Sequence, residues 1–366
     1  MWKRLLCSVL ILGALAGCGR GAQAPFDREA MLNGLVQRVI VPVHDAAAAE
    51  AATLAAAAHA FADTPTPANL AALQEQWRRT ALAWKEAELY AFRDVMILHS
   101  QIDKWPTNER FIEGFIAGTE RLDAAFAADI GSTSKGLPAV EYLIFDPKRP
   151  PDALVADFTA GAAGERRRQY VAALAQDLAA KTAELAAMWA GPDGQGAAFI
   201  AAATPGEDLN GSISMLTNEM IVLLEDIAQH KLGDPMGHLS FGVPAPTFVE
   251  AGRSGASLAL IRADLQGLTR AFHGGDAPDD VGLDDYLTYL DAEYEGQPLA
   301  AVISAQIDAA LAAVDAVDPP LRVAVEMNPD AVQAAYDAIE QLLVLVKVDM
   351  ANHLGVTVTF SDNDGD

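Results

Sequence analysis

The sequence predicts an all-α protein in which two helical bundles pack together. Alanine is abundant, with runs at residues 46–49 and 55–58, and it favours helix because it loses no side-chain entropy there. The one β-like run, residues 356–360, is short. Apolar residues recur at helical spacings of three, four and seven, as in Leu70, Leu73, Trp77, Ala81, Trp84, Ala91 and Val95.

Start and stop signals place the expected helices along the chain. Pro42 marks a break or kink in the first of them. Thr66 followed by Pro67 supplies a capping hydroxyl and a proline at the first helical position, and Gly355 suits a carboxyl-terminal cap. Residues 233–249 are rich in glycine and proline and form an irregular connection. The predicted helices cover residues 28–62, 67–98, 106–128, 138–145, 164–190, 207–231, 251–272, 283–294, 298–316 and 329–354.

The amino terminus is a separate unit. Lys3 and Arg4 precede an apolar stretch, residues 5–16, which has the length of a signal-peptide core and is too short to cross a bilayer. Leu-Ala-Gly-Cys at residues 15–18 resembles the bacterial lipobox, in which Cys18 becomes the first mature residue and carries lipid. An ordinary signal peptide with a cysteine nearby is the alternative. We therefore expect a lipoprotein-type signal peptide at residues 1–17 and a tether at residues 18–27.

The predicted location is the periplasmic side of a bacterial membrane, with membrane lipid bound through Cys18. Gly19 after the cysteine, in place of an aspartate, favours the outer membrane by analogy with enteric bacteria. Beyond the tether we expect a first bundle over residues 28–150 and a second over residues 151–366, which together form one domain.

The net charge limits the partners. The formal charge of −25 excludes nucleic acid, because such binding needs Lys and Arg to neutralise phosphates. The same acidity disfavours anionic lipid headgroups, so attachment to a membrane must come from another feature. A metal, a small ligand or an envelope partner protein remains compatible with this charge.

The strongest local pattern lies at residues 134–143. Familiar catalytic motifs such as His-Glu-x-x-His and Gly-x-Ser-x-Gly are absent from the sequence. Gly136 permits a sharp turn, Pro138 begins a helix, and Glu141 follows one turn inside an otherwise apolar helix. A carboxylate there needs a base, a hydrogen-bond donor or a metal. The alternative is a helix-start glutamate that the helix dipole favours.

Residues 136–141 (Gly-Leu-Pro-Ala-Val-Glu) resemble the Gly-x-His-x-x-Glu motif of the imelysin family, also classed as peptidase family M75. Four further pieces are similar to this family and span most of the mature chain. They are residues 102–106, 231–237, 250–254 and 354–360. The resemblance implies an exported, often iron-regulated protein, built from two bundles related by duplication, with a site between them.

One departure from the family pattern concerns the metal. Pro138 stands where the motif has histidine, and proline has no lone pair to offer. If the family's histidine and glutamate act as a metal pair, this chain has lost half of it. Glu141 would then remain as a hydrogen-bonding or structural residue. A bound metal ion, iron or zinc, stays open.

The resemblance implies a shared pocket, and its expected members come from three parts of the chain. Asp103 and Trp105 either line this pocket or close a helix–helix turn. Arg253 and Ser254 either bind an anion at a helix start or form a cap beside a solvated arginine. The expected pocket residues are Gly136, Pro138, Glu141, Asp103, Trp105, Arg253 and Ser254.

Histidines offer a second candidate metal site. His230 and His238 flank the irregular connection, and Glu225 and Asp226 lie about one turn before His230. Together with Glu141, the two histidines are the candidate metal ligands. Isolated histidines are more often solvated or hydrogen-bonded than metal-bound.

These features together predict a non-enzymatic, lipid-anchored imelysin-like protein of the cell envelope. Its role would be metal acquisition, of iron above all, through a ligand or a partner protein. An M75-type metallopeptidase, in which Glu141 polarises a metal-bound water, is the first alternative. A structural envelope lipoprotein without a small ligand is the second.

Overall fold

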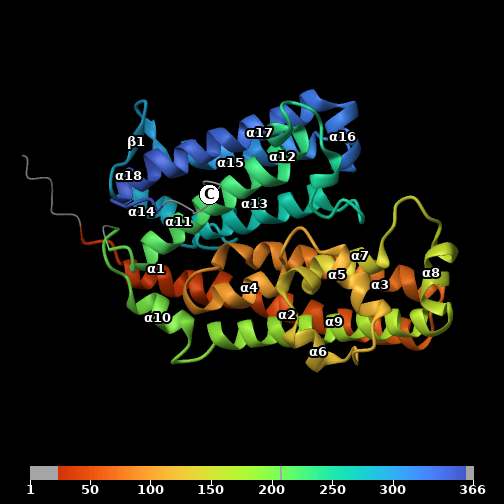
Figure 1. Ribbon diagram of the computed structural model, residues 1–366. Coiled ribbons are helices and arrows are strands. Elements are labelled where there is room, and N and C mark those ends of the chain that lie inside the picture. The colour runs from red at the N-terminus through yellow and green to blue at the C-terminus, as the bar shows by residue number, and fades with distance from the viewer. Residues whose placement is uncertain (1–23, 207, 360–366) are drawn as a thin grey trace, which may run out of the picture.

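The computed structural model describes residues 24–206 and 208–359, and helices dominate this part of the chain (Figure 1). The all-α fold class is confirmed. The expected signal peptide at residues 1–17, the acylated Cys18 and most of the tether lie outside the described residues. Two layers of helices are stacked on each other and run in similar directions.

The first bundle is built around α2 (Val41–Asp63), which packs against α3 (Pro67–Ala87) and α9 (Gly161–Trp189). The buried side of α2 is mostly alanine, so neighbouring helices approach it closely; its buried apolar residues include Ala47, Ala51, Leu54, Ala58 and Phe61. The other helices of this bundle are α1 (Arg28–Leu35), α4 (Met96–Ile102), α5 (Glu109–Ala117), α6 (Ala124–Asp129), α7 (Gly136–Ile144), α8 (Pro151–Thr159) and α10 (Gln195–Ala201).

The second bundle has α13 (Ser257–His273), α15 (Leu299–Asp315) and α17 (Pro329–Val344) as its long helices. The α13 helix also packs against α3, so it joins the two bundles. The remaining elements are α11 (Ser212–Glu225), α12 (Asp234–Met236), α14 (Leu283–Tyr289), α16 (Leu321–Met327), α18 (Ala351–Leu354) and the antiparallel pair β1 (Glu293–Tyr294) and β2 (Gln297–Pro298).

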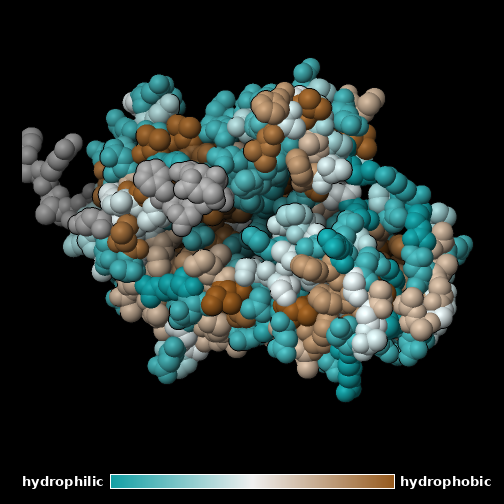
Figure 2. All heavy atoms as spheres, viewed as in Figure 1, coloured by the Kyte–Doolittle hydropathy of each residue, from teal (hydrophilic) through white to brown (hydrophobic). Residues whose placement is uncertain are grey.

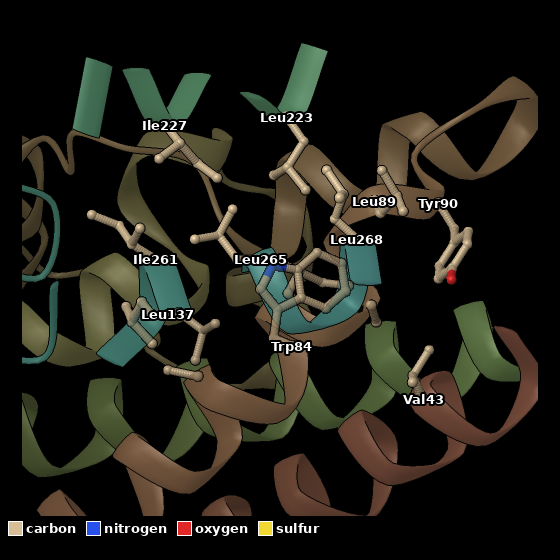
Figure 3. Packing of buried hydrophobic residues seen from close by; sticks show 14 of the residues in the cluster. Val43, Trp84, Leu89, Tyr90, Leu137, Leu223, Ile227, Ile261, Leu265 and Leu268 are labelled. Carbon is tan, nitrogen blue, oxygen red and sulfur yellow. The ribbon is translucent and has the colours of Figure 1, made fainter. Parts of the chain in front are cut away.

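One hydrophobic core runs through both bundles. Trp84 of α3 is 1% exposed and lies beside Leu265 and Leu268 of α13 (Figure 3). Leu223 of α11 approaches the same cluster from the second bundle. The two bundles therefore form one folding unit, since separating them would expose this shared apolar surface.

The boundary expected at residue 150 is corrected by these contacts. Both α8 and α9 pack within the first bundle, α9 mainly on α2 and α8 on α3 and α9. Apolar residues at helical spacing on α9, including Tyr170, Leu174 and Leu178, supply the buried face. The chain therefore enters the second bundle at α11, not at residue 151.

By length and composition alone Arg28–Asp63 could cross a membrane, yet in the structure α2 is the central helix of a bundle.

Several predicted helices are shorter or divided. The helix expected over 67–98 ends at Ala87, and Arg93 then takes a φ of 62°, which a helix does not tolerate. The helix expected over 106–128 is divided into α5 and α6, and the short helices α8, α10, α12 and α16 were not predicted. Residues 356–359 are extended without forming a strand, because Asn218 of α11 binds the backbone of Thr357 and Thr359.

Candidate functional site between the two bundles

Gly136 places α7 against the end of α4. Its φ is 72°, and a Cβ at this position would lie 2.2 Å from the carbonyl oxygen of Ile102. Only glycine permits this approach, because a side chain is strained at such a φ and has no room. Pro138 follows, buried, in the first turn of α7. The same contact brings α7 next to the segment that carries Asp103 and Trp105.

Glu141 of α7 is 2% exposed and crosses the seam between the bundles through one hydrogen bond. The backbone N–H of Ser254, in the loop before α13, donates to its Oε1 at 2.7 Å. Burial raises the pKa of the Glu141 carboxyl to about 7, although the hydrogen bonds from Ser254 and the charge of Arg253 oppose this rise. Near neutral pH this side chain is therefore present as both acid and carboxylate.

Arg253 lies over the first bundle although it belongs to the second. Its guanidinium pairs with Glu109 of α5 at 2.5 Å and stacks on the ring of Tyr142, 4.7 Å from the centroid. The Tyr142 hydroxyl in turn donates to Glu113 at 2.9 Å. These contacts hold the loop before α13 against α5 and α7.

A cavity of about 430 Å³ opens beside these residues and is walled by both bundles. In Figure 1 its segments meet at the right-hand end of the seam, where α7 faces the loop before α13. Hydrophilic side chains gather along the middle of this seam in the space-filling view (Figure 2). The cavity size suits a small ligand. Its charged and aromatic lining is Trp105, Glu109, Glu141, Asp146, Lys148, Arg253 and Arg322.

A second cavity of about 530 Å³ adjoins the first. Trp105, Pro106, Thr247 and Val249 line both. Asp103, which was expected beside Glu141, faces this second cavity instead. Of the expected pocket residues, Glu141 and Arg253 line the first cavity, Asp103 lines the second, and Trp105 lines both. Gly136, Pro138 and Ser254 line neither of these two cavities.

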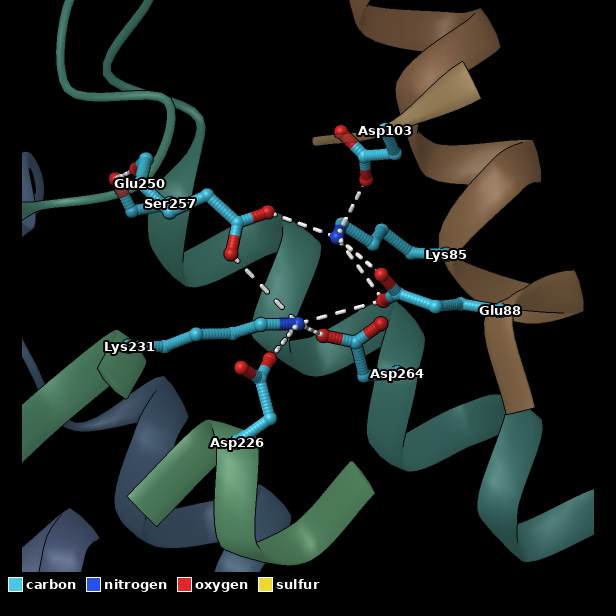
Figure 4. A network of polar contacts seen from close by, with 8 residues as sticks. All are labelled: Lys85, Glu88, Asp103, Asp226, Lys231, Glu250, Ser257 and Asp264. Atoms are coloured by element: carbon cyan, nitrogen blue, oxygen red, sulfur yellow. Dashed lines mark hydrogen bonds and ion pairs between the residues drawn. The ribbon is translucent and has the colours of Figure 1, made fainter. Parts of the chain in front are cut away.

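A network of two lysines and five carboxylates joins the bundles at the second cavity (Figure 4). Nζ of Lys85 lies 2.7 Å from Asp103, 2.8 Å from Glu250 and 2.9 Å from Glu88. Nζ of Lys231 lies 2.7 Å from Asp264, and it also contacts Asp226, Glu88 and Glu250. The contributing segments are α3, the 3-10 turn Glu88–Tyr90 that follows it, the turn after α4, the π-helical segment Asp226–Gly233, the loop before α13, and α13 itself.

Carboxylates outnumber ammonium groups in this network, and the pKa values respond. Burial alone would lower the pKa of Lys85, but Asp103, Glu250 and Glu88 raise it well above its usual value. Burial raises the pKa of Asp103 to about 6 against the opposing charge of Lys85, and burial also raises that of Asp264. Both lysines therefore stay charged, while some of the carboxyl groups of the network hold protons.

The two candidate histidines lie apart from Glu141. His230 lines the second cavity, and its Nδ1 is 2.9 Å from Asp234. His238 packs edge-on against Tyr336 of α17 at 4.9 Å between ring centroids. The structure thus places these histidines in separate contacts and brings neither to Glu141.

A metal held by Glu141 does not fit the donors at this position. Pro138 offers no lone pair, and Oε1 of Glu141 already accepts the Ser254 N–H. Within residues 24–206 and 208–359, no group of three or more His, Cys, Asp or Glu side chains has an arrangement that could hold a metal ion.

Sequence reasoning missed the central members of the ion network. Lys85 and Asp264 lie on the apolar faces of α3 and α13, and both are buried. A charged residue at a core position of an amphipathic helix is the signal that could have identified them. Their partners are far apart in sequence, so the pairing itself leaves no local pattern.

Comparisons with known proteins agree with this fold. The sequence profile of the imelysin family, peptidase family M75, matches residues 40–346. Iron-regulated protein A of Synechococcus elongatus is 25% identical over 213 residues, which are 56% of this chain and 54% of the relative. The match thus spans about half the length of that relative.

Two crystal structures have a similar fold. An iron-regulated protein A-like precursor from Parabacteroides distasonis superposes with a TM-score of 0.74 and 18% identity, over 91% of this chain and 97% of the other. An imelysin-like protein from Psychrobacter arcticum gives a TM-score of 0.70 and 19% identity, over the same shares of the two chains. At these identities the likeness concerns the fold alone.

Proposed function

Because the chain belongs to the imelysin family, we propose that it is an exported, lipid-anchored protein of the bacterial cell envelope that serves iron acquisition. It does so without catalysis, by binding a ligand in the seam between its two bundles.

The observation that carries this proposal is the position of Glu141. Its side chain is almost fully buried, yet it forms part of the wall of a cavity that both bundles enclose. Burying a carboxyl group is unfavourable unless it is hydrogen-bonded, and the Glu141 carboxyl both accepts from Ser254 and lines the cavity that a ligand would enter. A carboxyl group that is buried at a cavity wall, despite the unfavourable free energy of its burial, is typical of a binding site.

A binding role follows from the chemistry of the wall. Arg253, Trp105 and Glu141 supply hydrogen bonds and a flat apolar surface, which is what recognition of a small polar ligand requires. The position of the motif histidine is occupied by Pro138, so the chain lacks the donor that an M75-type metallopeptidase would use there.

The iron role and the location draw on the relatives and on the amino terminus. Two of the similar proteins are described as iron-regulated, and one of them is a precursor. The apolar leader and the Leu-Ala-Gly-Cys pattern support export and acylation of Cys18. Acyl chains contribute about 0.8 kcal/mol per buried methylene, so several chains would hold the protein at a membrane surface.

Cell fractionation tests the anchor. Wild-type protein should partition with membranes, and mass spectrometry should find an acylated amino-terminal Cys18. Cys18→Ala should appear in the soluble fraction, while Cys7→Ala should behave as wild type. Unmodified Cys18, or a membrane fraction that Cys18→Ala leaves unchanged, would refute the anchor.

Growth under iron limitation tests the physiological role. A deletion strain of the source bacterium should grow more slowly than its parent in chelator-treated medium, and added iron should restore growth. The wild-type gene should complement the defect. Equal growth of parent and deletion strains at every iron concentration would contradict the role in iron acquisition.

A further inference from the structure

Arg322 of α16 lies in the wall of the first cavity and has no ion-pair partner within the described part of the chain. Its Nε is buried and makes no hydrogen bond, and among the described residues its guanidinium forms no ion pair. A guanidinium carries five donors and cannot lose its charge, so such a group normally meets an anion or water. In a chain with a formal charge of −25, carboxylates are plentiful, yet none within residues 24–206 and 208–359 pairs with this arginine.

Trp105 is a second unsatisfied donor in the same wall. Its Nε1–H is buried and has no acceptor, although most buried indole N–H groups find one. The indole lines both cavities, so a ligand in either cavity would lie next to it. Two donors from different bundles, Trp105 and Arg322, therefore border one space and lack acceptors.

The acidic groups of the first cavity do not compensate these donors. Glu109 is occupied by Arg253 at 2.5 Å, and Asp146 accepts the backbone N–H of Lys148 at 2.9 Å. Burial raises the pKa of Glu141 to about 7, so near neutral pH a large share of it is uncharged and can donate its own O–H. The wall thus offers donors from Trp105, Arg322 and protonated Glu141 to whatever enters.

We infer that the first cavity binds a small molecule through a carboxylate, with the guanidinium of Arg322 and the indole N–H of Trp105 as its donors. The planar fork of arginine matches the two oxygens of a carboxylate better than it matches a point charge. This inference rests on the proposed ligand-binding role and names the chemistry of the ligand. The ligand is either a free polycarboxylate or its complex with iron.

Isothermal titration calorimetry on the detergent-solubilised full chain tests the inference, with citrate, ferric citrate and inorganic phosphate as probes. We expect citrate or ferric citrate to bind, and the tighter of the two identifies the free or the iron-bound form. A guanidinium fork also binds phosphate, but phosphate is one compact anion with no second carboxylate for the other donors of the wall, so it should bind at least about tenfold more weakly. Phosphate binding as tightly as citrate, or no binding of either citrate form, would overturn the assignment.

Three substitutions make the test specific. Arg322→Gln should weaken binding at least about tenfold, and Arg322→Lys should also weaken it because the fork is lost. Trp105→Phe keeps an aromatic ring and removes the N–H, so it should weaken binding about fivefold. Arg121→Gln is the matched control, because Arg121 is 89% exposed and forms a surface ion pair with Asp123. Equal affinity of wild type, Arg322→Gln and Trp105→Phe would refute the site.

The outcome is separable from that of the proposed function. An iron-dependent growth defect of the deletion strain together with no binding of citrate would overturn only the carboxylate site. Citrate binding that depends on Arg322, without any growth defect, would support the site and overturn the iron role.

Discussion

The backbone N–H of Ser254 donates to Oε1 of Glu141 at 2.7 Å, and this bond joins two residues 113 positions apart across the seam between the bundles. It fixes the loop before α13 to α7 and leaves the rest of the buried carboxyl at the cavity wall.

Glu141→Gln should stabilise the protein at alkaline pH. The pKa of Glu141 is raised to about 7 from 4.5, so the folded state binds the proton more tightly than the unfolded state. Between pH 4.5 and 7 wild-type stability therefore falls as pH rises, and the loss is complete above pH 7. Glutamine avoids this loss, on the order of 1–3 kcal/mol. Urea denaturation at pH 5 and pH 8 measures it, and a variant that is less stable than wild type at pH 8 would contradict the burial argument.

Gly136→Ala should destabilise the fold by more than about 3 kcal/mol, because the added Cβ meets the carbonyl of Ile102 and the φ of 72° is strained. Gly131→Ala is the matched control, since Gly131 has a negative φ and open space around its Cβ position. Thermal unfolding of the two variants checks the prediction. Similar melting temperatures would mean that α7 does not approach α4 as closely as the structure has it.

Lys85→Met should cost about 3–5 kcal/mol at pH 8, because it leaves Asp103, Glu250 and Glu88 without a buried counter-charge. The cost should be smaller at pH 5, since the pKa of Asp103 is about 6 and its carboxyl can then bind a proton. Arg79→Met, which removes a 3.3 Å contact with Glu75 between two exposed side chains, should change stability by less than about 1 kcal/mol. Denaturant titrations at both pH values decide the matter, and a cost independent of pH would argue against the charge network.

Acid should destabilise the protein through His44 and His99, which are buried beside Tyr90 and Trp84 in the first bundle. Burial lowers the pKa of His44 to about 4 and that of His99 to about 3, so the unfolded state binds protons first. Stability from these groups is full above pH 6.5 and is lost as pH falls towards 4.

His99→Leu should therefore lose less stability than wild type between pH 6.5 and 4, by on the order of 1–3 kcal/mol. His59→Leu, on the exposed face of α2, is the control substitution. The measurement is the melting temperature as a function of pH for all three proteins. Parallel curves for wild type and His99→Leu would show that His99 takes no part in acid unfolding.

The sequence was sufficient for the fold class and for part of the site, for identifiable reasons. Helical spacing and proline positions predict α2, α3 and α17, because these signals are local. Gly136, Glu141 and Arg253 were recognisable through the motif resemblance, and the structure brings Glu141 and Arg253 to one cavity.

The remaining features depend on contacts between distant segments. The pairing of Lys231 with Asp264 joins two helices, and nothing within either helix encodes it. The extended run at residues 356–359 has strand-like composition but no strand to pair with, so Asn218 satisfies its backbone instead. The boundary between bundles was misplaced because Pro150 and Pro151 end one connection within a bundle, and proline marks any turn equally well.

Uptake of radioactive iron by cells carrying a blocked cavity tests the central claim most directly. Thr247 is exposed and lines both cavities, so Thr247→Trp should fill their shared mouth without disturbing the core. Thr53→Trp, at an exposed position of α2, is the matched control. Under iron limitation we expect uptake in the Thr247→Trp strain to fall to the level of the deletion strain, while Thr53→Trp matches wild type. Wild-type uptake with normally folded, correctly located Thr247→Trp protein would contradict a ligand site between the bundles.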